Sequence, residues 1–346
     1  ATLAVADIGH DLYRSLAVER PTGNLVTSPV SVAVALSMVA AGAAGVTRDE
    51  LLRALAGTDP TVLHRSMNAM TAALDARNTD DLTLRLANSV WGQAGSSFGE
   101  PFLDLLATEY GAGLGTVDYV DDTEGAREAI NAWVAERTED RIPELIAEGV
   151  LTPDSRLTLV NAVYLRAPWQ LPFAESNTQD RPFTLDTGET VDHPRMRRTG
   201  TFPFAAGDGW VSVELPFGDG SLSMVVLLPE PGFLEYYQQT FLVSEATDYS
   251  TPTYVAVELP RFDAGSVIGL GTALQSLGVV TPFTTGADFS PMSTEEDLFL
   301  SAVVHAANIT VDERGADPAI DLRAVRMHAA GRSRARRGCS SRSASA

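Results

Sequence analysis

His305 is the side chain whose chemistry fits its surroundings least, because it stands in an apolar stretch of the chain. From Leu298 to Val311 most apolar residues fall on alternate positions, which is the pattern of a strand with one buried face. A buried imidazole must find hydrogen-bond partners. The sequence therefore favours a satisfied core histidine within a polar cluster over a metal ligand or a catalytic base.

Three other hydrogen-bonding residues, Ser28, Ser31 and Asn161, lie in otherwise apolar segments that are far apart in sequence. Ser28 is also a suitable N-cap for a helix, since Pro29 follows at the first helical position. Simple capping and core packing would account for each residue separately. One economical arrangement instead brings these three residues and His305 together, so that they satisfy one another.

A second pattern with chemical potential is G-x-S-x-G at residues 95–99, which matches the nucleophile elbow of hydrolases. That elbow requires a strand entering and a helix leaving at a sharp turn, with an acid and a histidine later in the chain. Here small residues run into Glu100 and Pro101, as in an ordinary loop before a helix. We interpret Ser97 as a loop residue and expect the protein not to be an enzyme.

Composition excludes several classes of function. All 25 basic residues are arginine, so a Walker A lysine and a Schiff-base lysine are excluded. The single cysteine, Cys339, excludes an internal disulfide and a cysteine-based zinc site. The formal net charge of −20 argues against a nucleic-acid partner, which requires a basic surface. We expect neither a cofactor nor a metal.

No segment of this sequence is expected to enter a membrane. No apolar run approaches the ~20 residues that a spanning helix needs. The N-terminal residues include acidic ones and lack the basic region of a signal peptide, so none is predicted in this sequence.

The first half of the chain is rich in helical patterns and the second half in strand patterns. Thr47–Glu50 matches a capping box at the start of a helix, and Gly218-Asp219-Gly220 predicts a hairpin turn. A helix is expected over 266–277. Without an internal repeat or a clear linker, the sequence predicts one domain. The other expected helices cover 3–20, 62–77 and 123–137, and strands are expected over 82–91, 157–166, 210–217, 221–229, 253–259 and 298–311.

Several segments resemble the serpin family, in the order in which that family has them. HAANITVDERG at residues 305–315 is similar to the strand and hinge that precede the serpin reactive-centre loop. Further matches are Asn161 with Trp169 and Phe173, the L-P-R-F of 259–262, and A-D-F-S at 287–290. The N-terminal serpin signature is matched at Asn24, Ser28, Pro29, Ser31, Ala35, Leu36 and Met38. The resemblance covers residues 3–315, and we expect a serpin of bacterial type.

The resemblance implies an α+β serpin fold, with an α-rich N-terminal half, large mixed and antiparallel β-sheets and an exposed reactive-centre loop. It also implies an inhibitor of serine proteases. The loop offers a peptide bond, the protease cleaves it and stays attached as an acyl-enzyme, and the freed loop inserts into the main sheet. An elastase- or subtilisin-like target, a monomeric state and an extracellular location are expected, while a cytoplasmic location stays open.

The resemblance also assigns roles to individual residues. The hinge of the loop is Glu313, Arg314, Gly315 and Ala316, and Trp169 belongs to the breach, where insertion begins. The reactive bond is expected between Ala329 and Ala330, from the usual spacing to the hinge. The shutter beneath the centre of the sheet is Ser28, Ser31, Asn161 and His305.

The chain departs from the family pattern after Gly315. Pro318 cannot donate to a β-ladder and so opposes insertion. Residues 1–315 hold 18 arginines against 43 acidic residues, whereas residues 316–346 hold 7 against 2. The family's closing strands are replaced by AGRSRARRGCSSRSASA, which we attribute to translation out of frame or a mispredicted gene end.

The expected organisation is therefore a serpin domain over 1–315 that is incomplete at its C-terminal end. A hinge and reactive-centre region follows over 316–330, and residues 331–346 form an atypical basic tail that is expected to be disordered. The alternative function is a non-inhibitory or truncated serpin, which a protease cleaves as a substrate without being trapped.

Overall fold

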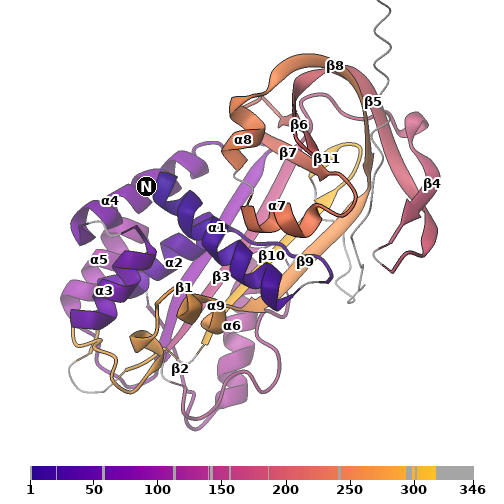
Figure 1. Ribbon diagram of the computed structural model, residues 1–346. Coiled ribbons are helices and arrows are strands. Elements are labelled where there is room, and N and C mark those ends of the chain that lie inside the picture. The colour runs from indigo at the N-terminus through magenta and orange to yellow at the C-terminus, as the bar shows by residue number, and fades with distance from the viewer. Residues whose placement is uncertain are drawn as a thin grey trace, which may run out of the picture. The chain divides into compact units, whose positions relative to one another are not determined.

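The protein's structure, a computed structural model, describes residues 2–20, 22–56, 59–111, 114–138, 140, 143–155, 157–185, 187–240, 243–293, 298–300 and 302–316 (Figure 1). Within these ranges, the helices are all too short or too polar to cross a membrane.

The described residues form two compact units. Unit 1 contains the chain up to Pro168, Asp263–Val311, and Gly315 with Ala316. Unit 2 contains Trp169–Phe262 and Asp312–Arg314. The chain therefore passes from one unit to the other four times within the described residues. The single domain expected from the sequence stays a prediction.

Unit 1 contains seven of the described α-helices. Helix α2 is its apolar centre, because every residue from Ser31 to Ala40 is buried. Its N-terminus is built as the sequence predicts, with the Ser28 hydroxyl accepting from the Ser31 backbone N–H and Pro29 at the first helical position. The helices are α1 (Thr2–Glu19), α2 (Pro29–Ala41), α3 (Gly45–Ala54), α4 (Pro60–Asp75), α5 (Glu100–Tyr110), α6 (Thr123–Arg137) and α9 (Gly271–Ser276).

The main sheet of unit 1 has the strand order β2-β1-β3-β11-β10-β9. Strands β1 and β3 are antiparallel over ten residue pairs, from Thr83–Arg166 to Gly92–Leu157. Strand β10 runs parallel to β3 from Ala302–Thr158 to Ala307–Val163. The strands are β1 (Thr83–Gln93), β2 (Leu114–Val117), β3 (Leu157–Pro168), β9 (Phe262–Gly269), β10 (Ala302–Val311) and β11 (Gly315–Ala316).

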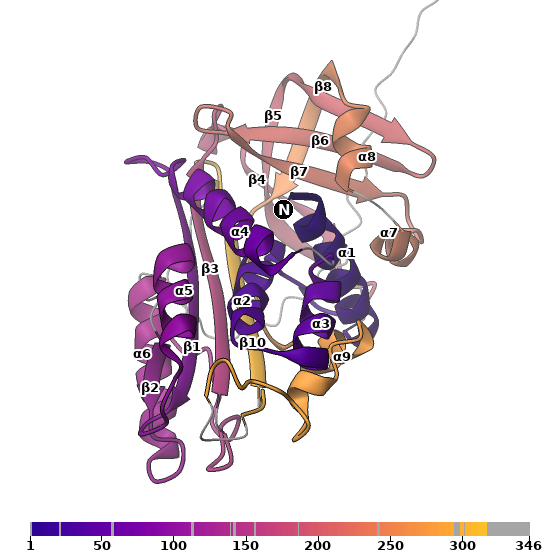
Figure 2. The same ribbon diagram turned by 90° about the vertical axis from the view of Figure 1, so that its left-hand side faces the viewer.

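The two faces of this sheet pack against different helices. Val90 and Val303 join the larger apolar cluster around α1–α5. Val160 and Val304 join a second cluster with Ile130 and other residues of α6. Neighbouring residues of a strand face opposite sides, so α2 and α6 cover opposite faces, as Figure 2 shows.

Three predicted boundaries are wrong. Helix α3 begins at Gly45, so Thr47 and Glu50 lie inside it rather than forming a capping box. Their side chains instead hold the segment 280–288: Thr47 Oγ1 accepts from Asp288 N–H, and Glu50 accepts from Thr281. The helix expected over 266–277 is strand β9 up to Gly269 followed by the short α9, and the strand expected from residue 298 begins at Ala302.

Unit 2 is built on a second sheet, with the order β4-β5-β6-β7 and with β8 also paired to β5. Strand β5 is long enough to pair with three neighbours, β4, β6 and β8. The hairpin predicted at Gly218-Asp219-Gly220 joins β6 and β7. The elements of unit 2 are β4 (Gln179–Thr184), β5 (Thr190–Gly207), β6 (Trp210–Phe217), β7 (Leu222–Pro229), β8 (Thr251–Pro260), α7 (Leu234–Thr240) and α8 (Val243–Asp248).

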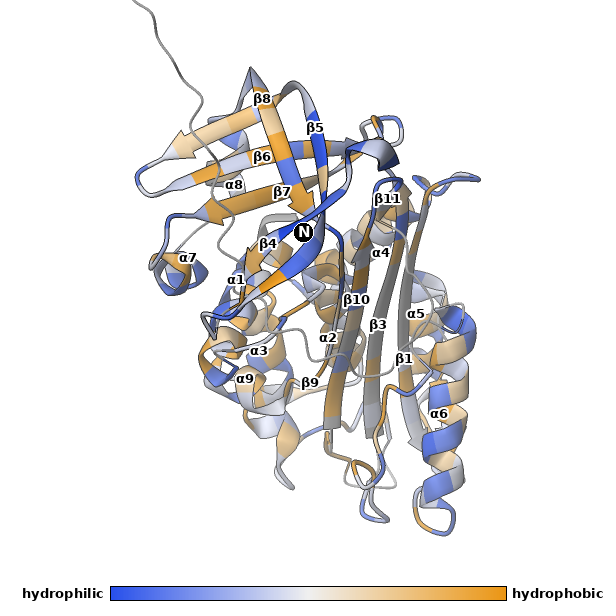
Figure 3. Ribbon diagram, turned by 90° about the vertical axis from the view of Figure 1, so that its right-hand side faces the viewer, coloured by the Kyte–Doolittle hydropathy of each residue, from blue (hydrophilic) through white to orange (hydrophobic). Residues whose placement is uncertain are grey.

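Strand β7 lies at one edge of this sheet and is apolar on both faces. Its sequence LSMVVLLP is the kind of continuous apolar run that central strands have. Yet every residue of β7 is only half-buried except Ser223, which is exposed. Figure 3 shows the strand as almost uniformly hydrophobic. Among the described strands only β6 pairs with it, and a strand edge left without a partner can associate with another chain.

We expect the substitution Val225→Lys to reduce self-association. Val225 is the cross-strand partner of Glu214, so the lysine gains an opposite charge while it interrupts the apolar edge. Light scattering at 37 °C should rise more slowly in the variant, and the free energy of unfolding should change by less than about 1 kcal/mol. Val280→Lys, an exposed change in unit 1, is the control. Equal aggregation of V225K and wild type would mean that this edge is not the contact.

Candidate functional site

Strands β3 and β10 of unit 1 pair directly along part of their length and are separated by strand β11 at one end. In one half they pair directly, in parallel. At the C-terminal end of β3 the two-residue strand β11 lies between them, with Ala316 paired to Ala167 of β3 and to Val311 of β10. Strand β11 is antiparallel to both neighbours, and Ala316 is 1% exposed. The predicted hinge residues Gly315 and Ala316 are therefore already part of the main sheet.

Gly315 is fitted tightly against β3. A Cβ at this position would lie 2.1 Å from the Ala167 carbonyl oxygen and 2.6 Å from Pro168 Cα. Both neighbours are backbone atoms, which cannot rotate away as a side chain can. A side chain at position 315 would therefore push β11 away from β3.

The three residues before Gly315 are held in unit 2. Trp169 donates its backbone N–H to the Arg314 carbonyl oxygen at 2.7 Å and its indole Nε1–H to the Asp312 carbonyl oxygen at 2.9 Å. Phe173 N–H donates to the Glu313 carbonyl oxygen at 2.9 Å. The Trp169 ring stacks on Phe217, with centroids 4.6 Å apart. We call Trp169 and Phe173, together with Thr178 and Arg261, which contact the Glu313 side chain, the hinge clasp.

The Glu313 carboxylate is the charged centre of the hinge clasp. It is 3% exposed and accepts from Arg261, with Nη2 at 2.6 Å from Oε1 and Nε at 2.8 Å from Oε2. The Thr178 hydroxyl also donates to Oε1. Burial raises the pKa of Glu313, but the hydrogen bonds from Arg261 and Thr178 outweigh it and leave the pKa below its usual value. The group is therefore ionised at neutral pH.

Three of the four residues of the predicted polar cluster, Ser28, Ser31 and His305, meet on the α2 face of the main sheet in unit 1. His305 is fully buried, and its Nε2 accepts from the Ser28 backbone N–H at 2.9 Å. The hydroxyls of Ser28 and Ser31 are 2.8 Å apart. The backbone of Asn161 is the register partner of His305 across β3 and β10, and Asn88 is the partner of Asn161 on β1.

His305 is held in its neutral form. Because Nε2 accepts a hydrogen bond, the proton is on Nδ1. Burial lowers the pKa of His305 to about 4. A neutral imidazole that binds the backbone is a structural element of the core, as the sequence favours. His305 also connects the start of α2 to strand β10, and β10 is the strand that would have to separate from β3 if β11 became longer.

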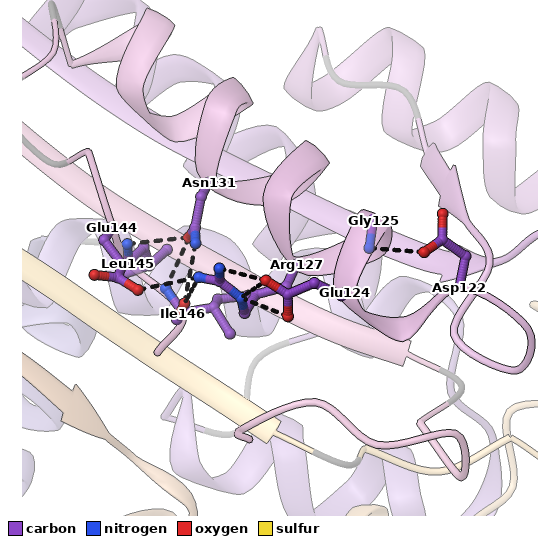
Figure 4. Close-up of polar contacts among 8 residues, drawn as sticks. All are labelled: Asp122, Glu124, Gly125, Arg127, Asn131, Glu144, Leu145 and Ile146. Carbon is purple, nitrogen blue, oxygen red and sulfur yellow. Dashed lines mark hydrogen bonds and ion pairs between the residues drawn. The ribbon is translucent and has the colours of Figure 1, made fainter. Parts of the chain in front are cut away.

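A strap after α6 crosses the opposite face of the same strands (Figure 4). Leu145 and Ile146 pack in one cluster with Val160 of β3 and Val304 of β10. The buried Asn131 side chain holds this strap by accepting from both backbone N–H groups, at 3.1 and 2.8 Å, and donating to the Ile146 carbonyl oxygen at 3.0 Å. Arg127 donates to the same carbonyl oxygen and pairs with Glu124 and Glu144.

Most predicted site residues fall into these clusters. Ser28, Ser31 and His305 meet, and Trp169 contacts the hinge residues 312–314. Ala329, Ala330 and the side chain of Asn161 lie outside the described part of the structure. Ser97 is exposed in the loop between β1 and α5. Sequence reasoning missed Arg261 and Thr178 as partners of Glu313, although Arg261 stands in the L-P-R-F segment that carried the resemblance.

The chain is similar to known proteins over most of its length. The family model "Serpin (serine protease inhibitor)" matches residues 3–335. "Leukocyte elastase inhibitor" of Xenopus tropicalis is 33% identical over 335 residues, covering 94% of this chain and 89% of the relative. The protein of the same name from Sus scrofa is 35% identical, with 89% of this chain and 85% of the relative covered.

Two solved structures have a similar fold. Serine protease inhibitor (serpin)-12 of Manduca sexta superposes with a TM-score of 0.84 at 30% identity, covering 90% of this chain and 88% of that one. Uncleaved ovalbumin gives a TM-score of 0.85 at 26% identity, covering 90% and 86%. The chain belongs to the serpin family, and the α+β serpin fold expected from the sequence is confirmed.

Two details of the expected resemblance gain no support. The two leukocyte elastase inhibitors come from vertebrates, so they do not support a bacterial type. The family match continues beyond Gly315 to residue 335, which does not support a sequence that leaves the family at that glycine.

We expect the buried His305 to make the stability depend on pH. With a folded pKa of about 4 and an unfolded pKa of 6.5, the unfolded chain binds a proton in this range and the folded chain does not. The free energy of unfolding should therefore fall as pH decreases from about 6.5 to 4, by up to about 3 kcal/mol. Urea unfolding at several pH values measures this slope.

The substitution His305→Gln removes the titrating group and keeps an acceptor for the Ser28 N–H. The stability of H305Q should change less between pH 6.5 and 4 than that of wild type. His193→Gln in unit 2 is the control. It leaves His305 in place, so the stability of this variant should depend on pH as that of wild type does. An unchanged slope in H305Q would show that His305 is not the group responsible.

We expect Arg261→Met to loosen the hinge clasp. The variant leaves the Glu313 carboxylate buried with Thr178 but without its cation, which should lower the free energy of unfolding by roughly 1–3 kcal/mol, since Arg261 is itself half-exposed. The double variant R261M/E313Q should lose less than the two single variants added together. Arg181→Met breaks an exposed pair with Glu258 and should cost less than about 1 kcal/mol. Strict additivity would contradict the pairing.

Proposed function

We propose that the protein inhibits serine proteases by presenting the chain after Ala316 as a substrate and then inserting it between β3 and β10. Strand β11 is the observation that carries the proposal. It already pairs with both strands at one end of their contact, so each further inserted residue would replace a direct β3–β10 hydrogen bond with bonds to the new strand.

The two polar clusters have distinct roles in this proposal. The hinge clasp, with Trp169 in the breach, fixes Asp312–Arg314 where insertion starts. The shutter of Ser28, Ser31, Asn161 and His305 lies farther along the seam between β3 and β10, and it resists the parting of the strands. No residue of the inhibitor performs catalysis; the protease supplies its own nucleophile, and insertion traps the acyl-enzyme.

An elastase-like protease is the target that we propose, with a subtilisin-like protease as the second choice. Small residues at the proposed reactive bond, Ala329–Ala330, suit a protease with a small specificity pocket. The curated relatives named as leukocyte elastase inhibitors support this class. We further propose that the protein acts as a monomer. The bacterial type and the change of sequence after Gly315 stay predictions, and an extracellular location finds no support in the comparisons.

The alternative, a serpin that is cleaved without trapping the protease, rests on Pro318 and on the basic segment 331–346. It is not favoured, because relatives named leukocyte elastase inhibitor align over about nine-tenths of this chain. One experiment separates the two.

The purified chain is incubated with elastase and, separately, with subtilisin, and the products are resolved on a denaturing gel. Inhibition predicts a band at the summed mass that survives SDS. Gly315→Val, which drives β11 off β3, should convert most of that band into cleaved chain of lower mass. Gly269→Val is the control, because this exposed glycine has no positive φ and no neighbour within 4 Å of its Cβ position. Rapid cleavage of the wild-type chain near residue 329 without a stable complex would favour the alternative.

A further inference from the structure

Unit 2 contains a cavity beside the hinge clasp. Its volume is about 180 Å³, and cavities of about 150 Å³ are known to hold a benzene ring. It is lined by the segment that follows β3 and by β5 and β6. Four of its lining residues are large apolar side chains that are each less than 5% exposed: Trp169, Phe173, Phe202 and Leu215.

One charged side chain, Arg198 of β5, also lines this cavity. Its Nη1 donates to the Pro172 carbonyl oxygen at 2.5 Å. Its Nε is buried, and no described residue accepts a hydrogen bond from it. None of the carboxylates in the described part of the chain forms an ion pair with this guanidinium. The neighbouring Arg197, by contrast, lies 3.8 Å from Glu258.

The geometry of the Arg198 guanidinium defines which hydrogen-bond acceptor it can bind. Nε and Nη2 form the edge of the guanidinium that binds both oxygens of a carboxylate. Because Nη1 is occupied by Pro172, that edge is the one left for an acceptor. A buried donor without a partner is unfavourable, and a ligand carboxylate would satisfy it with a charge-assisted bond.

From the ring-sized apolar cavity and its single unpaired cationic edge, we propose that it binds a small aromatic carboxylate. The ring lies among Trp169, Phe173, Phe202 and Leu215, and the carboxylate meets Arg198. The exposed Gln170 and Thr201 at the rim leave room for one polar substituent. Trp169 and Phe173 also hold the backbone of residues 312–314, so an occupied cavity would steady the hinge.

Phenylacetate is the probe, and binding is measured by calorimetry on the full chain, with the intrinsic tryptophan fluorescence, to which Trp169 contributes, as a second readout. We expect saturable binding with a dissociation constant of about 0.1–1 mM, the range for a ligand of this size. Phenylacetamide, which has the same shape without the charge, should bind at least about tenfold more weakly. This comparison uses only wild-type protein and does not depend on the proposed inhibitory function.

Arg198→Met keeps the length of the side chain and removes the donor, so phenylacetate should bind at least about tenfold more weakly. Arg197→Met is the matched control, since the next residue of a strand faces the other side, and it should bind as wild type does. Circular dichroism checks that both variants are folded. Equal binding of phenylacetate and phenylacetamide, or no saturable binding to wild type, would overturn the proposal.

Discussion

The structure depends on a competition for one row of backbone hydrogen bonds. Along most of their contact, β3 and β10 satisfy each other in parallel. At one end β11 takes the place between them and pairs with both, antiparallel. Antiparallel pairing is slightly more stable per residue than parallel pairing. An inserted strand would also replace the one hydrogen-bond ladder between β3 and β10 with two, one to each strand. The direct β3–β10 contact is therefore a state that a longer β11 could replace, and the surrounding residues determine how readily it does so.

Those residues act on both faces of the sheet. On the α2 face, His305 of β10 receives the Ser28 N–H, so a movement of β10 is coupled to the start of a buried helix. On the α6 face, Leu145 and Ile146 pack over the same strands and are tied to Asn131. Buried polar contacts of this kind contribute modestly when made but are costly to leave broken. They can therefore delay the parting of the strands without adding much to the total stability.

The sequence predicted the contact between Ser28 and His305, 277 residues apart, because polar side chains in apolar elements have few other ways to be satisfied. It did not predict the pairing of Arg261 with Glu313, since arginine and glutamate are ordinary surface residues and nothing local marks this glutamate as buried. The capping box at Thr47 failed for a related reason: its side chains found partners in the loop 280–288, which no local pattern reveals. Strand β11 is too short for any periodicity and is defined only by its pairing with β3 and β10.

The order of residues along the chain has a consequence for synthesis. The indole of Trp169 donates to the carbonyl oxygen of Asp312, 143 residues later, and the backbone N–H of Phe173 donates to the carbonyl oxygen of Glu313. On a ribosome, where the N-terminal part emerges first, both aromatic residues must stay without these partners while the whole of β4–β10 is made. Contacts between residues so distant in sequence also form slowly. The newly made protein thus passes through a long interval with its hinge unanchored and its apolar β7 already exposed, and a chaperone that shields extended apolar segments would have its greatest effect in that interval.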